Sequence, residues 1–184
     1  MKKTFYSLFI LFFFMGCKEI TTNIFKVIPA SNTIAERAYN FAELYKDSQT
    51  EYKLGGQDPV RSAIKIDCSG LIIMCYKYAI VDTQYELLEP DMTANYIYEN
   101  AAEIISKEQL RKGDLIFMGE ENSTEITHIA LFHKIENGYI YFIDSTQKDT
   151  NNDGIDDING VTYRFYPEND KRFKSFGIML LKEN

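Results

Sequence analysis

The feature that most constrains the fold is a change in hydrophobic periodicity partway along the chain. Residues 32–47 place apolar side chains at helical spacing, and residues 68–80 and 93–102 form two further helical runs. The later runs are short, rich in β-branched and aromatic residues, and bounded by Gly, Asn or Asp. They cover residues 113–119, 128–135, 138–145, 161–167 and 176–182. Helices followed by neighbouring strands predict an α+β fold, with N-terminal helices packed on an antiparallel β-sheet.

The helix predicted over residues 32–47 begins with a cap at Asn32 or Thr33. Its apolar positions lie on one face at helical spacing; they are Ile34, Ala38, Phe41, Ala42 and Tyr45. Gly55, Gly56 and Pro59 follow it and predict a loop before the second helix.

Composition and charge limit the class of protein. With 184 residues, of which 45% are hydrophobic and 26% charged, the chain suits one globular domain. Its formal net charge is −7, and no basic stripe interrupts the spread of acidic residues. Nucleic acid is therefore excluded as a partner, since its binding depends on basic contacts to phosphate.

The N-terminus has the pattern of an export signal. Two lysines precede an apolar run over residues 8–15, which is shorter than the roughly 20 residues of a membrane-spanning helix. Glycine followed by Cys17 resembles the end of a bacterial lipobox. We expect residues 1–16 to be a lipoprotein signal peptide, residues 17–31 a tether and residues 32–184 the folded domain. The protein would then be exported to the cell envelope, in the periplasm or at the cell surface, and anchored to a membrane through lipid on Cys17. Simple secretion and an uncleaved anchor are the alternatives.

Cys68 stands directly after Asp67, at the predicted start of the second helix. The partial positive charge at this end of a helix stabilises a thiolate, so Cys68 is a candidate nucleophile. Cys75 follows two turns later, roughly 10 Å away along the axis, which is beyond the reach of a disulfide. We expect Cys75 to be a small packing residue.

The base that would activate Cys68 is one of two histidines, because the chain has no others. His128 opens a predicted strand and His133 closes it. Five positions apart on a straight strand, they point to opposite faces. We choose His128, since it follows a polar loop at the strand edge. The alternative is that the cysteine and the histidine serve packing only.

Five motifs in order resemble the NlpC/P60 family of papain-like cysteine peptidases, which act on bacterial cell-wall peptides. They are EYKLGG, DCSGL, LRKGDLIF, THIALF and FIDS, and they span residues 51–145. The joint order is a stronger signal than any single motif. The resemblance implies a papain-like NlpC/P60 fold, with Cys68 as nucleophile and His128 as general base.

The resemblance also implies roles for residues around this pair. Tyr52 matches a tyrosine that lines the active site, and we predict that Tyr52 and Ser69 bind substrate. The family's third site member is a polar residue on the strand after that of the histidine, and Asp144 falls there. An aspartate accepts an imidazole N–H and fixes the ring's tautomer; we expect the nitrogen to be Nδ1. The family more often has His, Asn or Gln at this place, so Gln147 is the alternative.

Residues 149–160 depart from the family pattern by placing Asp and Asn at calcium-loop spacing. Gly160 stands where such a loop carries its closing acid. A surface loop with DG and NG turns accounts for the segment equally well, so calcium remains open. We assign no metal site and expect no cofactor.

Together these observations predict an exported, lipid-anchored cysteine peptidase. It would hydrolyse amide bonds in peptidoglycan stem peptides through Cys68, His128 and Asp144. Two alternatives stay open: an acyltransferase or amidase on the same fold, and a catalytically silent lipoprotein that binds the cell wall.

Overall fold

The computed structural model describes residues 25–57 and 64–183. The predicted signal peptide, Cys17 and most of the predicted tether lie outside the described residues. Within the described ranges, no helix is long and apolar enough to cross a membrane.

The three helices predicted from periodicity are present as α1 (Asn32–Asp47), α2 (Cys68–Ala79) and α3 (Ala94–Asn100). The predicted cap of α1 is wrong by at least one position. Ser31 caps this helix, since its hydroxyl accepts the N–H of Ile34 at 3.3 Å. Periodicity locates the buried face of a helix more sharply than its first residue, which depends on which polar side chain reaches a free N–H group.

The strands form one antiparallel system, which confirms the predicted α+β class. Its strands are β1 (Lys26–Pro29), β2 (Tyr85–Leu87), β3 (Ala102–Ile105), β4 (Leu115–Met118), β5 (His128–Glu136), β6 (Tyr139–Lys148), β7 (Ile158–Pro167) and β8 (Phe173–Glu183). The order across the sheet is β1-β8-β4-β5-β6-β7, and β2 and β3 also pair with β8.

The five predicted strands correspond to β4 through β8, whereas β1, β2 and β3 were not predicted. These three have only three or four residues each and all pair with β8. So short a strand shows little alternation of its own and is stabilised by its partner. Because β1 lies within residues 17–31, part of the segment predicted as a tether belongs to the sheet.

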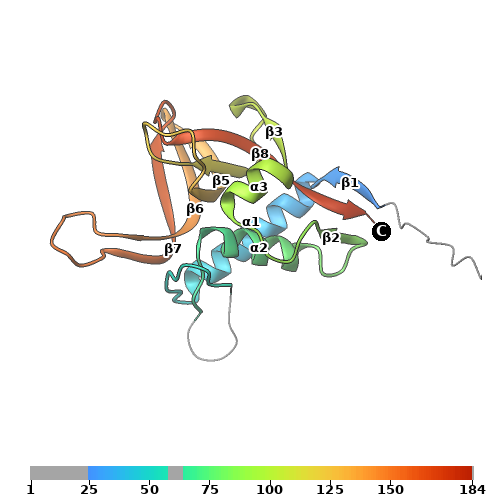
Figure 1. Ribbon diagram of the computed structural model, residues 1–184, viewed down its shortest axis with the longest axis horizontal. Coiled ribbons are helices and arrows are strands. Elements are labelled where there is room, and N and C mark those ends of the chain that lie inside the picture. Colours follow the sequence, from blue (N-terminus) through green and yellow to red (C-terminus); the bar gives the residue numbers. More distant parts are fainter. Residues whose placement is uncertain (1–24, 58–63, 184) are drawn as a thin grey trace, which may run out of the picture.

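Helices α1 and α2 lie side by side against one face of the curled sheet (Figure 1). Alternation along the strands divides the buried side chains between two cores. Leu115, Phe117, Ile129 and Leu131 face the helices and join the larger core. The other face carries a smaller core of Ile116, Met118, Ala130, Phe132, Ile140 and Phe142.

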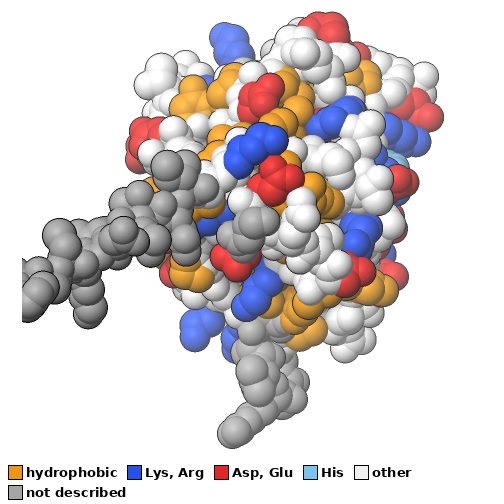
Figure 2. All heavy atoms as spheres, turned by 90° about the vertical axis from the view of Figure 1, so that its right-hand side faces the viewer, with side chains coloured by type: hydrophobic (Ala, Val, Ile, Leu, Met, Phe, Trp, Pro, Cys, Tyr) orange, Lys and Arg blue, Asp and Glu red, His pale blue; other side chains and the backbone are white. Residues whose placement is uncertain are grey.

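The surface over β1, β2 and the C-terminus carries basic and acidic side chains close to one another (Figure 2). The connection from β6 to β7 projects well away from the body of the protein (Figure 1).

Candidate active site

Asp67 sets the start of α2 and thereby the position of Cys68. One of its oxygens, Oδ1, accepts the backbone N–H of Gly70 at 2.7 Å and the hydroxyl of Ser69 at 3.1 Å. The other, Oδ2, accepts the N–H of Gly55 at 2.7 Å. Asp67 is only 6% exposed. One buried carboxylate therefore caps the helix and ties it to the preceding loop.

Gly70 is required because the helix start and the loop are in close contact. A Cβ atom built on Gly70 would lie 2.1 Å from the carbonyl oxygen of Gly56. That same oxygen accepts the N–H of Asp67 at 3.1 Å. The glycine of the DCSG motif thus lets the loop backbone lie against α2.

We expect Gly70→Ala to lower the free energy of unfolding by about 2 kcal/mol or more, because backbone atoms have to move to relieve the overlap. Gly138→Ala is the control. Gly138 has a φ of +79° but no atom within 4 Å of an added Cβ, so only about 1 kcal/mol of backbone strain is expected. Urea titration of both variants measures the difference. Equal losses would contradict the contact.

His128 and Asp144 contact each other from the neighbouring strands β5 and β6. Nε2 of His128 lies 2.5 Å from Oδ2 of Asp144. The carboxylate is fully buried, while the imidazole retains 20% exposure. The expectation that Nδ1 would face Asp144 is wrong. The sequence does not determine which nitrogen meets the carboxylate, because this depends on the rotation of the ring about χ2.

This contact decides the tautomer of His128. With Nε2–H donating to the carboxylate, the neutral ring has its lone pair on Nδ1. Cys68, which is 8% exposed, lies close enough to His128 to influence its pKa. The arrangement leaves Nδ1 as the nitrogen that can exchange a proton with the thiol.

Opposing effects act on the pKa of His128. Burial lowers it, but the hydrogen bond and charge of Asp144 and the proximity of Cys68 together raise it to about 9. The imidazolium form therefore predominates at neutral pH. A stable imidazolium is the partner that a catalytic thiolate needs.

Arg164 on β7 completes the cluster, although it was not predicted from the sequence. Its Nε donates to Asp144 Oδ1 at 3.0 Å and to Oδ2 at 3.1 Å, and its Nη2 also contacts Oδ2. The same Nη2 lies 3.2 Å from Nε2 of His128. Because Nε2 already donates to Asp144, this last pair is a contact between two donors and not a hydrogen bond.

The guanidinium explains how a fully buried carboxylate stays ionised. Burial alone would raise the pKa of Asp144, but His128 and Arg164 outweigh it and hold that pKa below its ordinary value. The Arg164 side chain is itself only 9% exposed. The sequence signal for this residue was an arginine among the aromatic residues of VTYRFYP. That Asp144 is its partner follows only from the pairing of β7 with β6.

The two predicted substrate-binding residues lie near the helix start. Burial raises the pKa of Tyr52, and the charges of Cys68 and Asp67 raise it further, so the phenol is close to both groups. The backbone N–H of Tyr52 donates to Asn159 Oδ1 at 2.8 Å. The hydroxyl of Ser69 is used in the Asp67 cap. Contact of either residue with substrate stays a prediction.

Three other candidates lie apart from this cluster. Cys75 is fully buried, and desolvation raises its pKa well above the ordinary value. Both cysteines of the described chain are free thiols. His133 stacks on Tyr39 of α1, with ring centroids 5.2 Å apart. Gln147 is exposed and donates to Asp156 at 2.5 Å. Of the two alternatives for the third position, the structure brings Asp144 and not Gln147 to His128.

The loop with calcium-like spacing is held by its own hydrogen bonds. Asp149 accepts the N–H groups of Asn151 and Gly154, and Asp157 accepts the N–H of Thr150. In the described part of the chain, no group of three or more His, Cys, Asp or Glu residues is placed to hold a metal ion.

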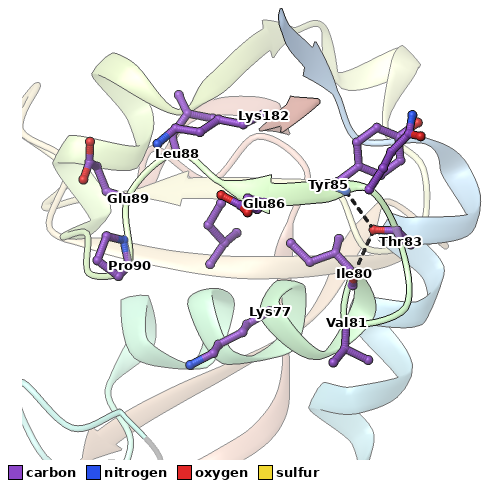
Figure 3. Close-up of a pocket in the computed structure, with 12 residues that line it drawn as sticks. Lys77, Ile80, Val81, Thr83, Tyr85, Glu86, Leu88, Glu89, Pro90 and Lys182 are labelled. Carbon is purple, nitrogen blue, oxygen red and sulfur yellow. Dashed lines mark hydrogen bonds between the residues drawn. The ribbon is translucent and has the colours of Figure 1, made fainter. Parts of the chain in front are cut away.

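A cavity of about 610 Å³ lies at the far end of α2 (Figure 3). Its wall includes Lys77 of α2 and Glu86 of β2. The rise of α2 places Cys68 roughly 17 Å from this end of the helix. Despite its size, this cavity is therefore separate from the cysteine and histidine cluster.

Comparison with known proteins shows which family the chain matches. Residues 49–164 match the family described as the NlpC/P60 family. NlpC1 from Trichomonas vaginalis is 22% identical, with 81% of this chain and 44% of that chain covered and a TM-score of 0.52. An NlpC/P60 family protein from Bacillus cereus is 19% identical, with 81% and 40% covered and a TM-score of 0.50. No curated protein sequence matches. The chain spans less than half the length of these two structures, and the likeness concerns the fold.

Proposed function

Because the chain belongs to the NlpC/P60 family of cell-wall hydrolases, we propose that it is a cysteine peptidase that cleaves amide bonds in peptidoglycan stem peptides. The single observation that carries this proposal is the linked set of Cys68, His128 and Asp144. A thiol at a helix start lies near an imidazole whose other nitrogen is held by a buried carboxylate. Residues that served packing alone would not need a thiol, an imidazole and a carboxylate linked in this order.

In the proposed reaction, the Cys68 thiolate attacks the carbonyl carbon of the scissile amide. The developing oxyanion is stabilised at the start of α2, where the Asp67 cap uses the N–H of Gly70 and not that of Cys68. The protonated Nδ1 of His128 then gives its proton to the leaving amine, and the C–N bond breaks. A thioester to Cys68 remains.

Hydrolysis completes the cycle. His128, now neutral, takes a proton from water through Nδ1, and the resulting hydroxide attacks the thioester carbonyl. The acid product leaves and the Cys68 thiolate and His128 imidazolium are restored. Asp144 remains ionised and holds Nε2–H throughout, so its task is to orient the ring.

Purified muropeptides test the proposal. We expect the protein to convert them into two smaller products whose masses sum to the substrate plus one water. Mass spectrometry identifies the cleaved bond. An acyltransferase would instead give a product that carries the added acceptor, and a silent binding protein would leave the muropeptides intact.

We also propose export and lipid attachment at Cys17, on the basis of the apolar N-terminal run that ends in Gly-Cys. In a bacterium with lipoprotein processing, the full chain is expected to fractionate with membranes, and Cys17→Ser to prevent acylation. Cys75→Ser, which leaves the N-terminus unchanged, is the control. A mature wild-type protein whose N-terminus is not Cys17 would exclude the anchor.

A further inference from the structure

A second cavity opens beside His128. Its volume is about 140 Å³, below the roughly 300–1,000 Å³ of pockets that enclose whole small-molecule ligands. His128 forms part of its wall, together with Lys148, Arg164, Tyr166 and Arg172. A space of this size suits one small group of a larger substrate.

The cations of the wall are only partly neutralised. Arg164 is paired with Asp144, and Arg172 is paired with Asp170 through an Nη2 to Oδ2 contact of 2.7 Å. Lys148 differs, because no carboxylate of the described residues lies within 4.0 Å of its ammonium group. The acidic residue of the lining is Glu120, whose side chain is exposed.

The hydroxyl of Tyr166 retains its own hydrogen for donation. It accepts a hydrogen bond from Nη1 of Arg164 at 2.7 Å and another from Nζ of Lys148 at 3.3 Å. A phenol oxygen that accepts two hydrogen bonds still has its own O–H to give. The cavity therefore offers N–H donors of Lys148 and an O–H donor of Tyr166 to the same small group. Such a set of donors favours an anion.

We propose that this cavity binds a carboxylate on the amine side of the scissile bond. The inference rests on the proposed peptidase function and specifies its substrate. The acyl half of the substrate becomes attached to Cys68, whereas the leaving amine receives its proton from His128. The leaving half therefore lies against His128, which lines the cavity, while Cys68 does not.

Pairs of muropeptides test this site. The two members of a pair differ at one carboxylate, which is free in one member and amidated in the other. Binding is measured by calorimetry on the Cys68→Ala protein, which has no nucleophile, at low ionic strength. At the amine-side position, we expect the free carboxylate to bind about tenfold more tightly than its amide, since a charge-assisted hydrogen bond is lost in the amide. Raising the salt concentration should reduce the difference.

Lys148→Met in the same background is expected to bring the ratio of the two dissociation constants close to one. Lys171→Met is the matched control and should retain the ratio, because Lys171 is an exposed lysine that does not line the cavity. A ratio near one with Lys148 present, or an unchanged ratio in Lys148→Met, would overturn the inference.

The turnover assay separates this inference from the proposed function. Wild-type protein that hydrolyses both members of every pair with equal kcat/KM would leave the peptidase function intact and refute the carboxylate site. A tenfold binding preference without any hydrolysis by the wild type would refute the peptidase function and support the cavity as a binding site of a silent protein.

Discussion

Cys68→Ala is expected to abolish muropeptide hydrolysis while leaving the fold nearly unchanged. The substitution removes only the sulfur, and alanine is compatible with the first position of a helix. The Asp67 cap uses backbone groups of Gly70 and Gly55, so it persists in the variant. The measurement is product formation by mass spectrometry, with circular dichroism and thermal unfolding to verify folding.

Cys75→Ala is the matched control, because it removes the other described thiol from the same helix. Cys75 is fully buried, so about 1 kcal/mol of stability should be lost through reduced packing. Its kcat/KM should remain at the wild-type value. Hydrolysis that persists in Cys68→Ala but disappears in Cys75→Ala would remove Cys68 from the mechanism.

Asp144→Ala should lower kcat/KM by a factor on the order of 10² or more, since His128 loses the acceptor that orients its ring. Asp144→Asn retains an oxygen that can accept Nε2–H and should lose less activity. Asp144→Asn should nevertheless lower the free energy of unfolding, because Arg164 would keep a buried charge without a carboxylate partner. Breaking such a pair costs about 3 kcal/mol or more.

Comparison of Asp144→Asn with Gln147→Ala tests the assignment by kinetics and by urea unfolding. Gln147 is exposed and contacts Asp156, so its loss should change neither quantity appreciably. If Gln147→Ala inactivates the protein and Asp144→Ala does not, the third position belongs to Gln147. If neither does, the site operates with Cys68 and His128 alone.

The pH dependence follows from the same contact. In the folded protein the pKa of His128 is about 9, above its ordinary value of 6.5. The contribution of protonated His128 to the free energy of unfolding is therefore fully present below about pH 6.5 and is lost as pH rises through 9. The basic limb of kcat/KM should lie near pH 9. In Asp144→Ala it should move to lower pH, since the carboxylate that raises the pKa is gone.

The sequence determined those parts of the site that depend on local patterns. Asp67 before Cys68 indicated a helix start, and the apolar run after it predicted α2. His128 follows a polar loop and opens an apolar run, and this pattern predicted the start of a strand. These assignments succeed because a cap and a periodicity act over a few residues.

Side-chain contacts between different strands could not be predicted from the sequence. Arg164 meets Asp144 because β6 and β7 pair with Asp144 opposite Thr162, a register that no local pattern reveals. Likewise, the nitrogen that faces Asp144 depends on a ring rotation. The short strand β1 was assigned to a tether because its stability comes from pairing with β8. The missed contact of Arg164 and the missed strand β1 both depend on residues far apart in the chain. The cap of α1 and the ring rotation of His128 are instead local side-chain arrangements that periodicity does not specify.

The measurement that most directly tests the central claim follows muropeptide hydrolysis by the wild-type protein as Cys68 is progressively alkylated with iodoacetamide. Peptide mapping by mass spectrometry gives the modified fraction of Cys68 and of Cys75 at each time. If Cys68 is the nucleophile, the remaining activity falls in proportion to its unmodified fraction and reaches zero while the buried Cys75 stays unmodified. Substantial hydrolysis by protein whose Cys68 is fully alkylated would contradict the account.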